Sequence, residues 1–258
     1  MSDTNSPVPS EPTVRGSGVL IAVATYNERE NLPLLVERIR ATVPNADILV
    51  VDDNSPDGTG QWVLEQAKED EHLLPMNRSG KLGLGTAVIA ALQFAVEKQY
   101  KYVVNMDADF SHPVDVIPDL IRRAEQVDHP ADVVIGSRYV KGGGVVGWPL
   151  VRRLMSRGIN LFARVMLRLS TRDNSGSFRC YRVSLLEKFD FNSLRSRGYS
   201  FFEEVLYRLK RIGATFAEVP ITFTDRTRGV SKINKKEALT AVWLLFRIGL
   251  FRNGSPKM

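Results

Sequence analysis

The amino-acid sequence predicts an α/β fold with a mostly parallel central sheet. Three observations support this prediction. Continuous apolar runs, typical of strands buried on both faces, alternate with segments of helical periodicity. The spacing of the alternation is typical of β-α-β units. Polar residues stand where the apolar runs end, which is the edge at which open parallel sheets bind ligands.

The composition is that of a globular protein with a basic surface. The chain has 258 residues, 43% of them hydrophobic, which is enough for one large domain or two small ones. The net charge of +6 favours an anionic partner: phosphate groups, nucleic acid or a membrane surface. We expect no nucleic acid, because the chain lacks a motif that combines aromatic and basic residues. The single cysteine, Cys180, excludes an internal disulfide and a cysteine metal cage.

The first elements follow one another regularly. Residues 1–18 are rich in Ser, Pro and Thr and lack the apolar segment of a signal peptide, so we expect a disordered tail. The apolar run at 19–25 predicts a buried strand. Asn31 can cap the next helix, with Pro33 just inside it and the helix running up to Pro44. The same criteria predict a strand at 48–51, a helix at 59–71 and a helix at 86–97.

The strand at 103–106 leads into two carboxylates, Asp107 and Asp109. Residues i and i+2 of a strand point to the same side, so both side chains can converge on one hard cation. An EF-hand loop is excluded, because its sixth and twelfth positions hold His112 and Pro118 instead of Gly and Glu. The alternative is that the carboxylates merely solvate a turn. This alternative loses weight because Glu28, Asp53 and Arg138 also stand at predicted strand ends.

The second half of the chain is less regular. A long helix is predicted from Trp148 to about Leu169, and its two sides differ. One side carries Trp148, Arg152, Ser156, Asn160 and Arg164, and the other carries Leu150, Leu154, Leu161, Val165, Met166 and Leu169. Such a helix suits a core edge or a membrane surface, and the sequence leaves both open. The remaining predicted elements are helices at 117–125, 185–189 and 201–212 and strands at 132–137 and 216–223, the last at a sheet edge because of Pro220.

Four segments are predicted to be loops. The glycine-rich stretch 80–85 is similar to a phosphate loop, although neither common phosphate-loop pattern fits it. Residues 140–147 include three consecutive glycines and are expected to form a mobile loop over the site. Residues 173–179 are polar. Residues 226–232 hold three cations around a glycine, so this segment is either a lid for phosphates or a solvated basic turn.

An apolar segment, Ala238 to Phe251, lies near the end of the chain. It is too short to span a membrane, and Arg247 interrupts it. It can lie in a membrane interface, dock on a partner's helices or pack on the domain, and flanking Lys and Arg residues favour the first two. The expected organisation is therefore a disordered tail at 1–18, a catalytic domain at 19–234 and an amphipathic helix or tail at 235–258.

The residues at the predicted strand ends indicate chemistry through charge and positioning. No Ser-His-Asp or Cys-His arrangement is apparent, and the chain has only three histidines. Carboxylates that hold a divalent metal, together with Arg and Lys for phosphates, can neutralise a diphosphate leaving group. A nucleotide-sugar transferase fits this description.

Several motifs, in order, resemble those of dolichol-phosphate (polyprenol monophosphate) mannosyltransferases of the soluble catalytic type. The resemblance runs from about Leu20 to Lys232. Its motifs are Ala24 to Glu28, Val51 to Thr59, Lys81 to Gly85, Met106 to Pro113, Gly136 to Tyr139 and Ser231-Lys232. It implies the GT-A fold, a Rossmann-like fold of nucleotide-diphospho-sugar transferases. It also implies an inverting, metal-dependent transfer of mannose from GDP-mannose to dolichyl or polyprenyl phosphate, giving polyprenyl phosphate β-D-mannose and GDP.

The resemblance also implies roles for individual residues. Asp107, Asp109 and Arg138 would be catalytic, with Asp107 and Asp109 holding Mg²⁺ or Mn²⁺. The donor would contact Tyr26, Glu28, Val51, Asp53, Lys81, Asp107, Ala108, Asp109, Arg226 and Lys232. The acceptor phosphate would contact Arg138, Arg152, Ser156 and Asn160. No general base is needed, because a lipid phosphate is already anionic.

The chain departs from the family pattern at Ala24, where Pro is usual, and at Ser175, where Thr is usual. The long C-terminal membrane spans of some relatives are absent, so we expect a peripheral protein on the cytoplasmic face of a membrane, with a small membrane-anchoring subunit as a candidate partner. Two alternatives remain. One is a related transferase that uses UDP-glucose or UDP-N-acetylglucosamine, and the other is a non-catalytic sugar-nucleotide-binding membrane adaptor.

Overall fold

A seven-stranded sheet forms the centre of the molecule. The computed structural model describes residues 18–196, 198 and 200–225. The strand order is β3-β2-β1-β4-β7-β5-β8, and only β7 runs antiparallel to its neighbours. The predicted mostly parallel α/β sheet is therefore confirmed. The strands are β1 (Val19–Thr25), β2 (Asp47–Asp52), β3 (Leu73–Asn77), β4 (Tyr102–Asp107), β5 (Val133–Ser137), β7 (Arg179–Arg182) and β8 (Phe216–Pro220).

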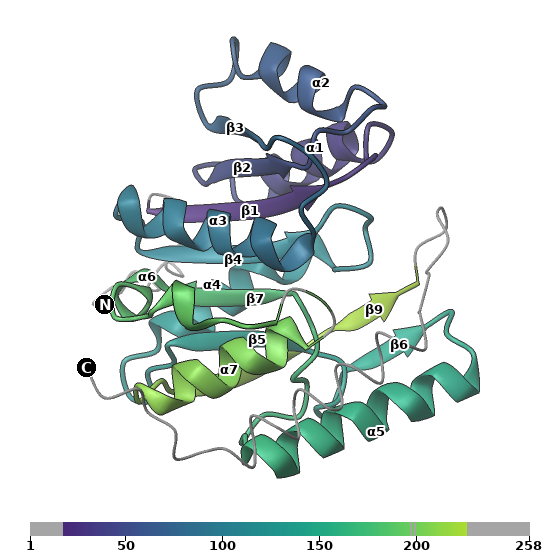
Figure 1. The fold of residues 1–258 in the computed structure, drawn as a ribbon, viewed down its shortest axis with the longest axis vertical. Helices are drawn as coiled ribbons and strands as arrows, with labels where there is room; N and C mark the ends of the chain where they lie inside the picture. The colour runs from purple at the N-terminus through teal and green to yellow at the C-terminus, as the bar shows by residue number, and fades with distance from the viewer. Residues whose placement is uncertain (1–17, 197, 199, 226–258) are drawn as a thin grey trace, which may run out of the picture.

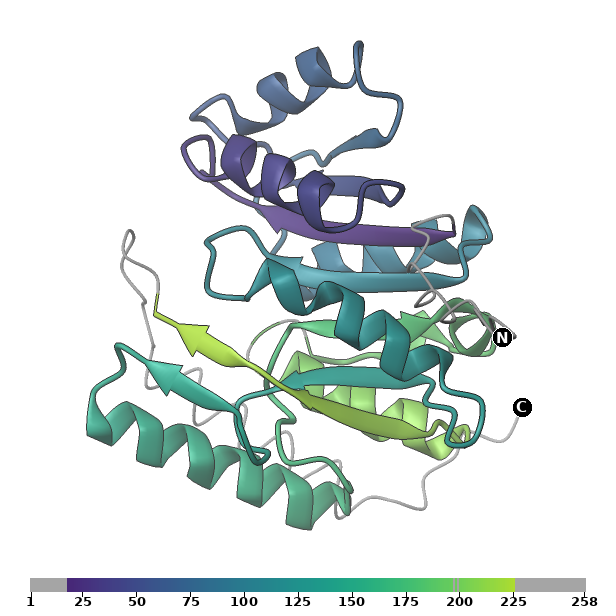
Figure 2. The ribbon, with the colours of Figure 1, turned by 180° about the vertical axis from the view of Figure 1, so that it is seen from behind.

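Helices cover both faces of this sheet. Helices α3 (Leu84–Glu97), α6 (Val183–Leu186) and α7 (Phe201–Arg211) lie on the face toward the viewer in Figure 1. Helices α1 (Leu32–Thr42) and α4 (Ile117–Glu125) lie on the opposite face, which Figure 2 shows from its own side. Successive residues of β1 alternate between the two resulting cores, as side chains of a strand must: Ile21 and Val23 join one, and Leu20 and Ala22 the other.

A small second sheet and a long helix extend from one side of the main sheet. Strand β6 (Gly144–Val146) pairs in parallel with β9 (Thr222–Thr224), and helix α5 (Leu150–Leu167) follows β6 (Figures 1 and 2). The expectation of a mobile loop at 140–147 is therefore wrong for residues 144–146, because β9 supplies a hydrogen-bonding edge from a distant part of the sequence. The strand predicted at 216–223 is in fact two strands, since the chain passes from one sheet to the other at Ile221.

Other boundaries differ from the prediction for local reasons. Helix α2 (Thr59–Gln66) is shorter than expected, and β3 follows it where no strand was predicted. Pro75 is acceptable in β3 because this strand lies at the sheet edge. Asn31 precedes α1 as predicted, but its side chain makes no capping bond and instead donates to a Glu28 carboxylate oxygen at 2.8 Å. The predicted helix at 185–189 is α6, which begins and ends earlier.

Some predictions concern residues outside the described part of the chain. These are the tail at 1–17, the basic segment at 226–232 with Arg226 and Lys232, and the apolar segment at 238–251. Within the described residues, no helix is both long enough and apolar enough to cross a membrane.

Candidate functional site

The carboxyl ends of parallel strands bring the candidate residues to one edge of the sheet. β1, β2, β4 and β5 all run in the same direction and end at Thr25, Asp52, Asp107 and Ser137. Glu28, Asp53, Asp109 and Arg138 follow within three residues of these ends. The sequence-based expectation that these strand ends lie together at one edge is confirmed.

Asp107 is the last residue of β4. Its Oδ1 accepts a hydrogen bond of 3.0 Å from the Ser177 hydroxyl, and its side chain is 30% exposed. Two residues on, Asp109 accepts bonds at Oδ1 from the Ser111 amide at 3.1 Å and the Ser111 hydroxyl at 2.5 Å. Each carboxylate is thus oriented through one oxygen by a serine hydroxyl. Ala108 between them is buried.

His112 is a buried neighbour of the two carboxylates, and no functional role was predicted for it from the sequence. Its Nδ1 accepts a hydrogen bond of 3.1 Å from the Asp107 amide, so in the neutral ring the proton is on Nε2. Nε2 lies 3.9 Å from Asp107 Oδ2. Burial lowers the pKa of His112 despite the nearby carboxylates. Its ring stacks on Phe178, with centroids 5.0 Å apart. In the sequence, His112 was marked only by its place in the motif Met106 to Pro113, five residues after Asp107.

The two carboxylates fit a metal that takes part of its ligands from a substrate. Among the described residues, no three His, Cys, Asp or Glu side chains are grouped as a complete metal site would require. Mg²⁺, however, commonly uses one or two carboxylates and completes its shell with water and substrate phosphates. Oδ2 of Asp109 has no hydrogen bond to a described residue, and Oδ2 of Asp107 has only the distant His112 contact. Asp107 and Asp109 could therefore hold Mg²⁺ or Mn²⁺ against a diphosphate.

Asp53 organises the glycine-rich loop that precedes α3. Its Oδ1 forms an ion pair with Arg78, and its Oδ2 accepts hydrogen bonds from the amides of Leu82 and Gly83 at 3.0 and 3.1 Å. The similarity of this stretch to a phosphate loop does not extend to these two amides, because they donate to a carboxylate of the same chain. Asp53 and Arg78 instead hold the loop against the start of α3.

Lys81 of this loop contacts Tyr26, which follows β1. The Lys81 ammonium lies 4.0 Å from the centroid of the Tyr26 ring, which is close cation–π contact. The structure thus brings together two residues that are 55 positions apart in the sequence and that were both predicted to contact the donor. Val51, a third predicted donor contact, is buried within β2. The Glu28 amide donates to the Thr59 hydroxyl at 3.0 Å, which fixes the turn after β1 against α2.

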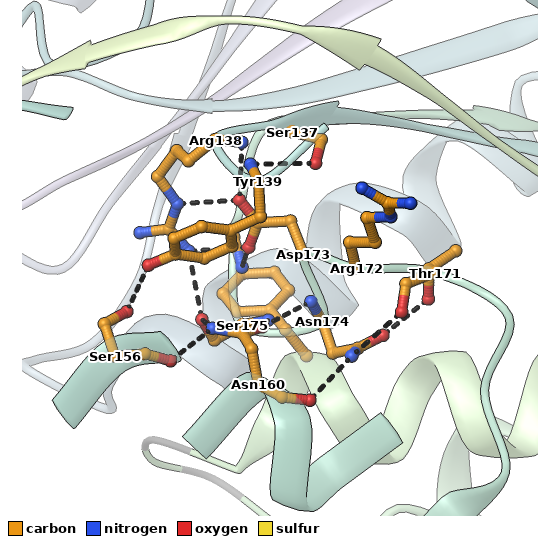
Figure 3. Close-up of polar contacts among 12 residues, drawn as sticks. Ser137, Arg138, Tyr139, Ser156, Asn160, Thr171, Arg172, Asp173, Asn174 and Ser175 are labelled. Atoms are coloured by element: carbon orange, nitrogen blue, oxygen red, sulfur yellow. Dashed lines mark hydrogen bonds and ion pairs between the residues drawn. The ribbon is translucent and has the colours of Figure 1, made fainter. Parts of the chain in front are cut away.

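Arg138 is a buried cation held by a buried carboxylate (Figure 3). Asp173 accepts from the Arg138 side chain at Nε (2.7 Å) and Nη2 (2.6 Å) and from its backbone amide at 2.9 Å. Burial alone would raise the pKa of Asp173, but the Arg138 guanidinium outweighs it and holds that pKa below its usual value. The guanidinium also lies within 5.6 Å of the ring centroids of Tyr139, Trp148 and Phe223. Arg138 was predicted as a site residue from the sequence, whereas Asp173 was not.

Asn160 of α5 holds the polar loop that follows α5 close to Arg138 (Figure 3). Its Oδ1 accepts from the amides of Asn174 and Ser175, and its Nδ2 donates to the Ser156 carbonyl and the Ser175 hydroxyl. Ser175 in turn accepts a hydrogen bond of 3.0 Å from Arg138. All four hydrogen-bonding positions of the Asn160 amide are therefore occupied within the protein. Asn160, which was predicted to contact the acceptor phosphate, here holds the loop that contains Asn174 and Ser175.

Arg152 and Ser156 lie on the same face of α5. Arg152 pairs with Asp225 at 2.9 Å and stacks over Trp148 at 4.1 Å, whereas Ser156 accepts a hydrogen bond of 2.6 Å from the Tyr139 hydroxyl. Trp148 and Phe223 meet edge to face, and Phe223 also contacts His112, with centroids 5.6 Å apart. These aromatic contacts connect the Arg138 cluster with Asp107 and Asp109. A chain of side-chain contacts through His112 and Phe223 thus joins Asp107 to Arg138.

A family model matches this chain, and curated proteins are similar to it over most of its length. The model describes glycosyl transferase family 2 and matches residues 20–190. The chain is 42% identical over 232 residues to the undecaprenyl-phosphate mannosyltransferase of Micrococcus luteus, covering 90% of this chain and 94% of that protein. It is also 42% identical over 240 residues to the polyprenol monophosphomannose synthase of Mycolicibacterium smegmatis, covering 92% and 88%.

Solved structures share the fold at lower identity. Glucosyl-3-phosphoglycerate synthase from Mycobacterium tuberculosis, crystallised with Mn²⁺, UDP and phosphoglyceric acid, matches with a TM-score of 0.64 and 18% identity, covering 94% of this chain and 80% of that chain. The same enzyme with Mg²⁺ and UDP also gives a TM-score of 0.64, covering 94% and 81%. The expected GT-A glycosyltransferase fold is confirmed by this likeness and by the family match.

Proposed function

Since the chain belongs to glycosyl transferase family 2, we propose that it transfers mannose from GDP-mannose to the phosphate of a polyprenol. The chain is a glycosyltransferase, and its resemblance to polyprenyl-phosphate mannosyltransferases agrees with the names of the two relatives from Micrococcus luteus and Mycolicibacterium smegmatis. The observation that carries the proposal is 42% identity over nine tenths of the chain to proteins that carry these names.

The proposed reaction needs no basic residue to activate the acceptor. An oxygen of the lipid phosphate attacks the anomeric carbon of mannose while the bond from that carbon to the GDP oxygen breaks, so the configuration inverts and GDP leaves. The acceptor oxygen is already anionic, which is consistent with a neutral His112 beside the carboxylates. The task of the protein is to align two anionic groups that would otherwise repel each other.

Five of the described residues would supply most of this alignment. Asp107 and Asp109 would hold the divalent metal, which neutralises the charge that develops on the diphosphate. Arg138, kept in one orientation by Asp173, would place its positive charge where the acceptor phosphate approaches. Arg152 and Ser156, on the same face of α5, would add polar groups beside Arg138. Tyr26 and Lys81 would contact the nucleotide side of the donor.

The proposal is tested by transfer of radiolabelled mannose from GDP-mannose to a polyprenyl phosphate in detergent, with Mg²⁺ or Mn²⁺ and then with EDTA. We expect a labelled lipid that forms only with the metal. Equal incorporation of glucose from UDP-glucose would remove the assignment of the donor. Binding of GDP-mannose without any product from polyprenyl phosphates of several lengths would remove the assignment of the acceptor.

A further inference from the structure

Arg179 of β7 is a fully buried cation without an ion pair in the described part of the chain. Its guanidinium donates to the carbonyl oxygens of Asn174 at 2.6 Å and Phe202 at 2.9 Å. No carboxylate of the described residues forms an ion pair with it, and its Nε has no hydrogen-bond partner among them. Carbonyl oxygens offset a full positive charge only in part, so Arg179 leaves positive potential in the interior.

Glu203 of α7 brings a buried carboxyl to the same region. It follows Phe202, whose carbonyl oxygen binds Arg179, and its Oε2 has no hydrogen-bond partner among the described residues. The Tyr181 hydroxyl is unpaired there as well, and Tyr181 lies on the same side of β7 as Arg179. Burial raises the pKa of Tyr181, which therefore stays neutral near pH 7. Of these side chains, only Glu203 can supply a negative charge to balance Arg179.

The neighbouring Glu204 has a different role. Its two carboxylate oxygens accept hydrogen bonds from the backbone amides of Arg195 and Ser196, and it forms an ion pair with Arg208 at 2.6 Å. Glu204 therefore holds the segment that precedes α7. Glu203 has no ion-pair partner within the described residues, so an ion pair does not explain a buried carboxyl at this position.

Glu203 decides the net charge of a buried cluster that includes Arg138. Arg138 and Arg179 are positive and Asp173 is negative, so the cluster carries one positive charge while Glu203 is neutral and none once Glu203 is ionised. Burial raises the pKa of Glu203 to about 7, and Asp173 acts in the same direction, whereas Arg179 and Arg138 act against it. Both charge states of the cluster are therefore accessible near neutral pH.

This cluster is connected to the proposed acceptor site through the polar loop after α5. Asn174, whose carbonyl oxygen binds Arg179, follows Asp173, and Asp173 holds Arg138 (Figure 3). Charges interact strongly in a low-dielectric interior, where salt screens them little. A second positive charge behind Arg138 therefore strengthens the attraction for a phosphate that approaches Arg138, and a negative charge on Glu203 removes this gain.

We propose that Glu203 is a positioning residue that sets the affinity of the enzyme for its anionic acceptor. Neutral Glu203 leaves the charge of Arg179 to reinforce Arg138, and ionised Glu203 cancels that charge. The inference rests on the proposed function for the identity of the acceptor. Linkage is reciprocal, so binding of an anion must favour the neutral form of Glu203 to the same extent, and binding near pH 7 takes up protons.

The first test compares the pH dependence of KM in the wild type and Glu203→Gln, which stays neutral at every pH. A short-chain polyprenyl phosphate is the acceptor, with saturating GDP-mannose and metal, from about pH 5.5 to 8.5. The acceptor's own titration affects both proteins equally, so it cancels in the ratio of the two KM values. We expect equal KM values at the acid end and an about fivefold lower KM for Glu203→Gln at the alkaline end, with kcat little changed. Glu187→Gln, at an exposed residue, should follow the wild type.

The second test needs no transfer, so it separates failure of this inference from failure of the proposed function. Isoamyl sulfate is a sulfate ester whose single negative charge does not change over this pH range. Its binding is measured by calorimetry at pH 7 in two buffers that differ in ionisation enthalpy. We expect the wild type to take up about 0.3 proton per bound anion and Glu203→Gln to take up almost none.

Three outcomes would overturn the inference. The first is a ratio of KM values that is the same at every pH, or a KM of Glu203→Gln above that of the wild type, since either is what a purely structural role predicts. The second is binding of the sulfate ester by the wild type without proton uptake, a result that stands even where Glu203→Gln does not fold. The third is no binding of the sulfate ester at any pH, because the reinforced cation would then attract no anion.

Discussion

At the scale of single residues, the site depends on a few charged groups that the fold places in low-dielectric surroundings. Arg138 and Asp173 are the clearest case, because both are buried and each neutralises the other. Breaking such a pair leaves one buried charge uncompensated, which costs far more than loss of an exposed ion pair.

Asp173→Asn is therefore expected to destabilise the protein by roughly 3–5 kcal/mol. The variant keeps the shape of the side chain but removes the charge that balances Arg138. Chemical denaturation followed by circular dichroism measures the change. Asp115→Asn is the control, since Asp115 pairs with Arg38 on the surface and both side chains are more than half exposed. Its loss should cost less than about 1 kcal/mol. Equal effects of the two substitutions would contradict the proposed importance of the buried pair.

Asp109→Ala should abolish metal-dependent transfer while leaving the protein folded. Loss of a group that only supports a metal ligand typically costs 10–100-fold, so we expect loss of the ligand itself to exceed about 100-fold in kcat/KM. The melting temperature should change little, because Asp109 lies in a loop beyond the end of β4 and bonds only to Ser111 among the described residues. Asp128→Ala, at an exposed residue, is the control. Wild-type activity of the Asp109 variant would remove it from the metal site.

At the scale of elements, the segment between β5 and α5 is held close to the site by backbone contacts. A Cβ on Gly143 would lie 2.5 Å from the Ser137 carbonyl oxygen and 3.0 Å from the Arg138 carbonyl carbon. The segment can approach Arg138 this closely only because residue 143 has no side chain. The adjacent Gly144 has open space around the corresponding position.

Gly143→Ala should accordingly displace the backbone of Arg138, destabilise the protein by about 1–3 kcal/mol and lower transferase activity. Gly144→Ala should leave the free energy of unfolding within about 0.5 kcal/mol of the wild type. Thermal unfolding and the transfer assay on both variants compare the two adjacent positions. If both alanines behave alike, steric crowding at Ser137 is not what fixes this segment.

Long periodic or apolar elements were predictable from the sequence, whereas elements that depend on distant partners were not. The carboxylates at the end of β4 were identifiable because an uninterrupted apolar run precedes them. Strand β7 was missed because its sequence, Arg-Cys-Tyr-Arg, has no strand pattern of its own. Arg179 is fully buried there only because its guanidinium donates to the carbonyls of Phe202 and Asn174. Asp173 was likewise missed, since its partner Arg138 is 35 residues away.

At the scale of the whole molecule, one buried carboxyl makes stability depend on pH. Glu203 of α7 is 2% exposed, and its Oε2 has no hydrogen-bond partner among the described residues. Burial raises its pKa to about 7, even though Arg179 acts in the opposite direction. The folded protein therefore keeps a proton that the unfolded chain releases at lower pH.

The stability of the wild type should fall as the pH rises from about 4.5 to 7 and then level off, with a contribution from Glu203 of at most about 3 kcal/mol. Below this range the Glu203 carboxyl is protonated in the folded and in the unfolded protein, and above it the carboxyl is ionised in both. The contribution of Glu203 to the free energy of unfolding therefore changes with pH only within this range. Melting temperatures of the wild type and Glu203→Gln across this range test the expectation. The variant should have the flatter profile, and Glu187→Gln, at an exposed residue, should follow the wild type. Parallel profiles of the wild type and Glu203→Gln would exclude Glu203 as the cause.

The position of β7 also determines the order in which the molecule can be completed during its synthesis. β7 lies between β4 and β5, yet the ribosome makes it more than 40 residues after β5. Since neighbouring strands are about 4.8 Å apart, a nascent chain that ends near Ser137 lacks the strand needed to bridge about 10 Å between β4 and β5. Both strands would then present unpaired edges, which favour aggregation. The final relative positions of Asp107 and Arg138 therefore depend on β7, which is the last of these three strands to be synthesised.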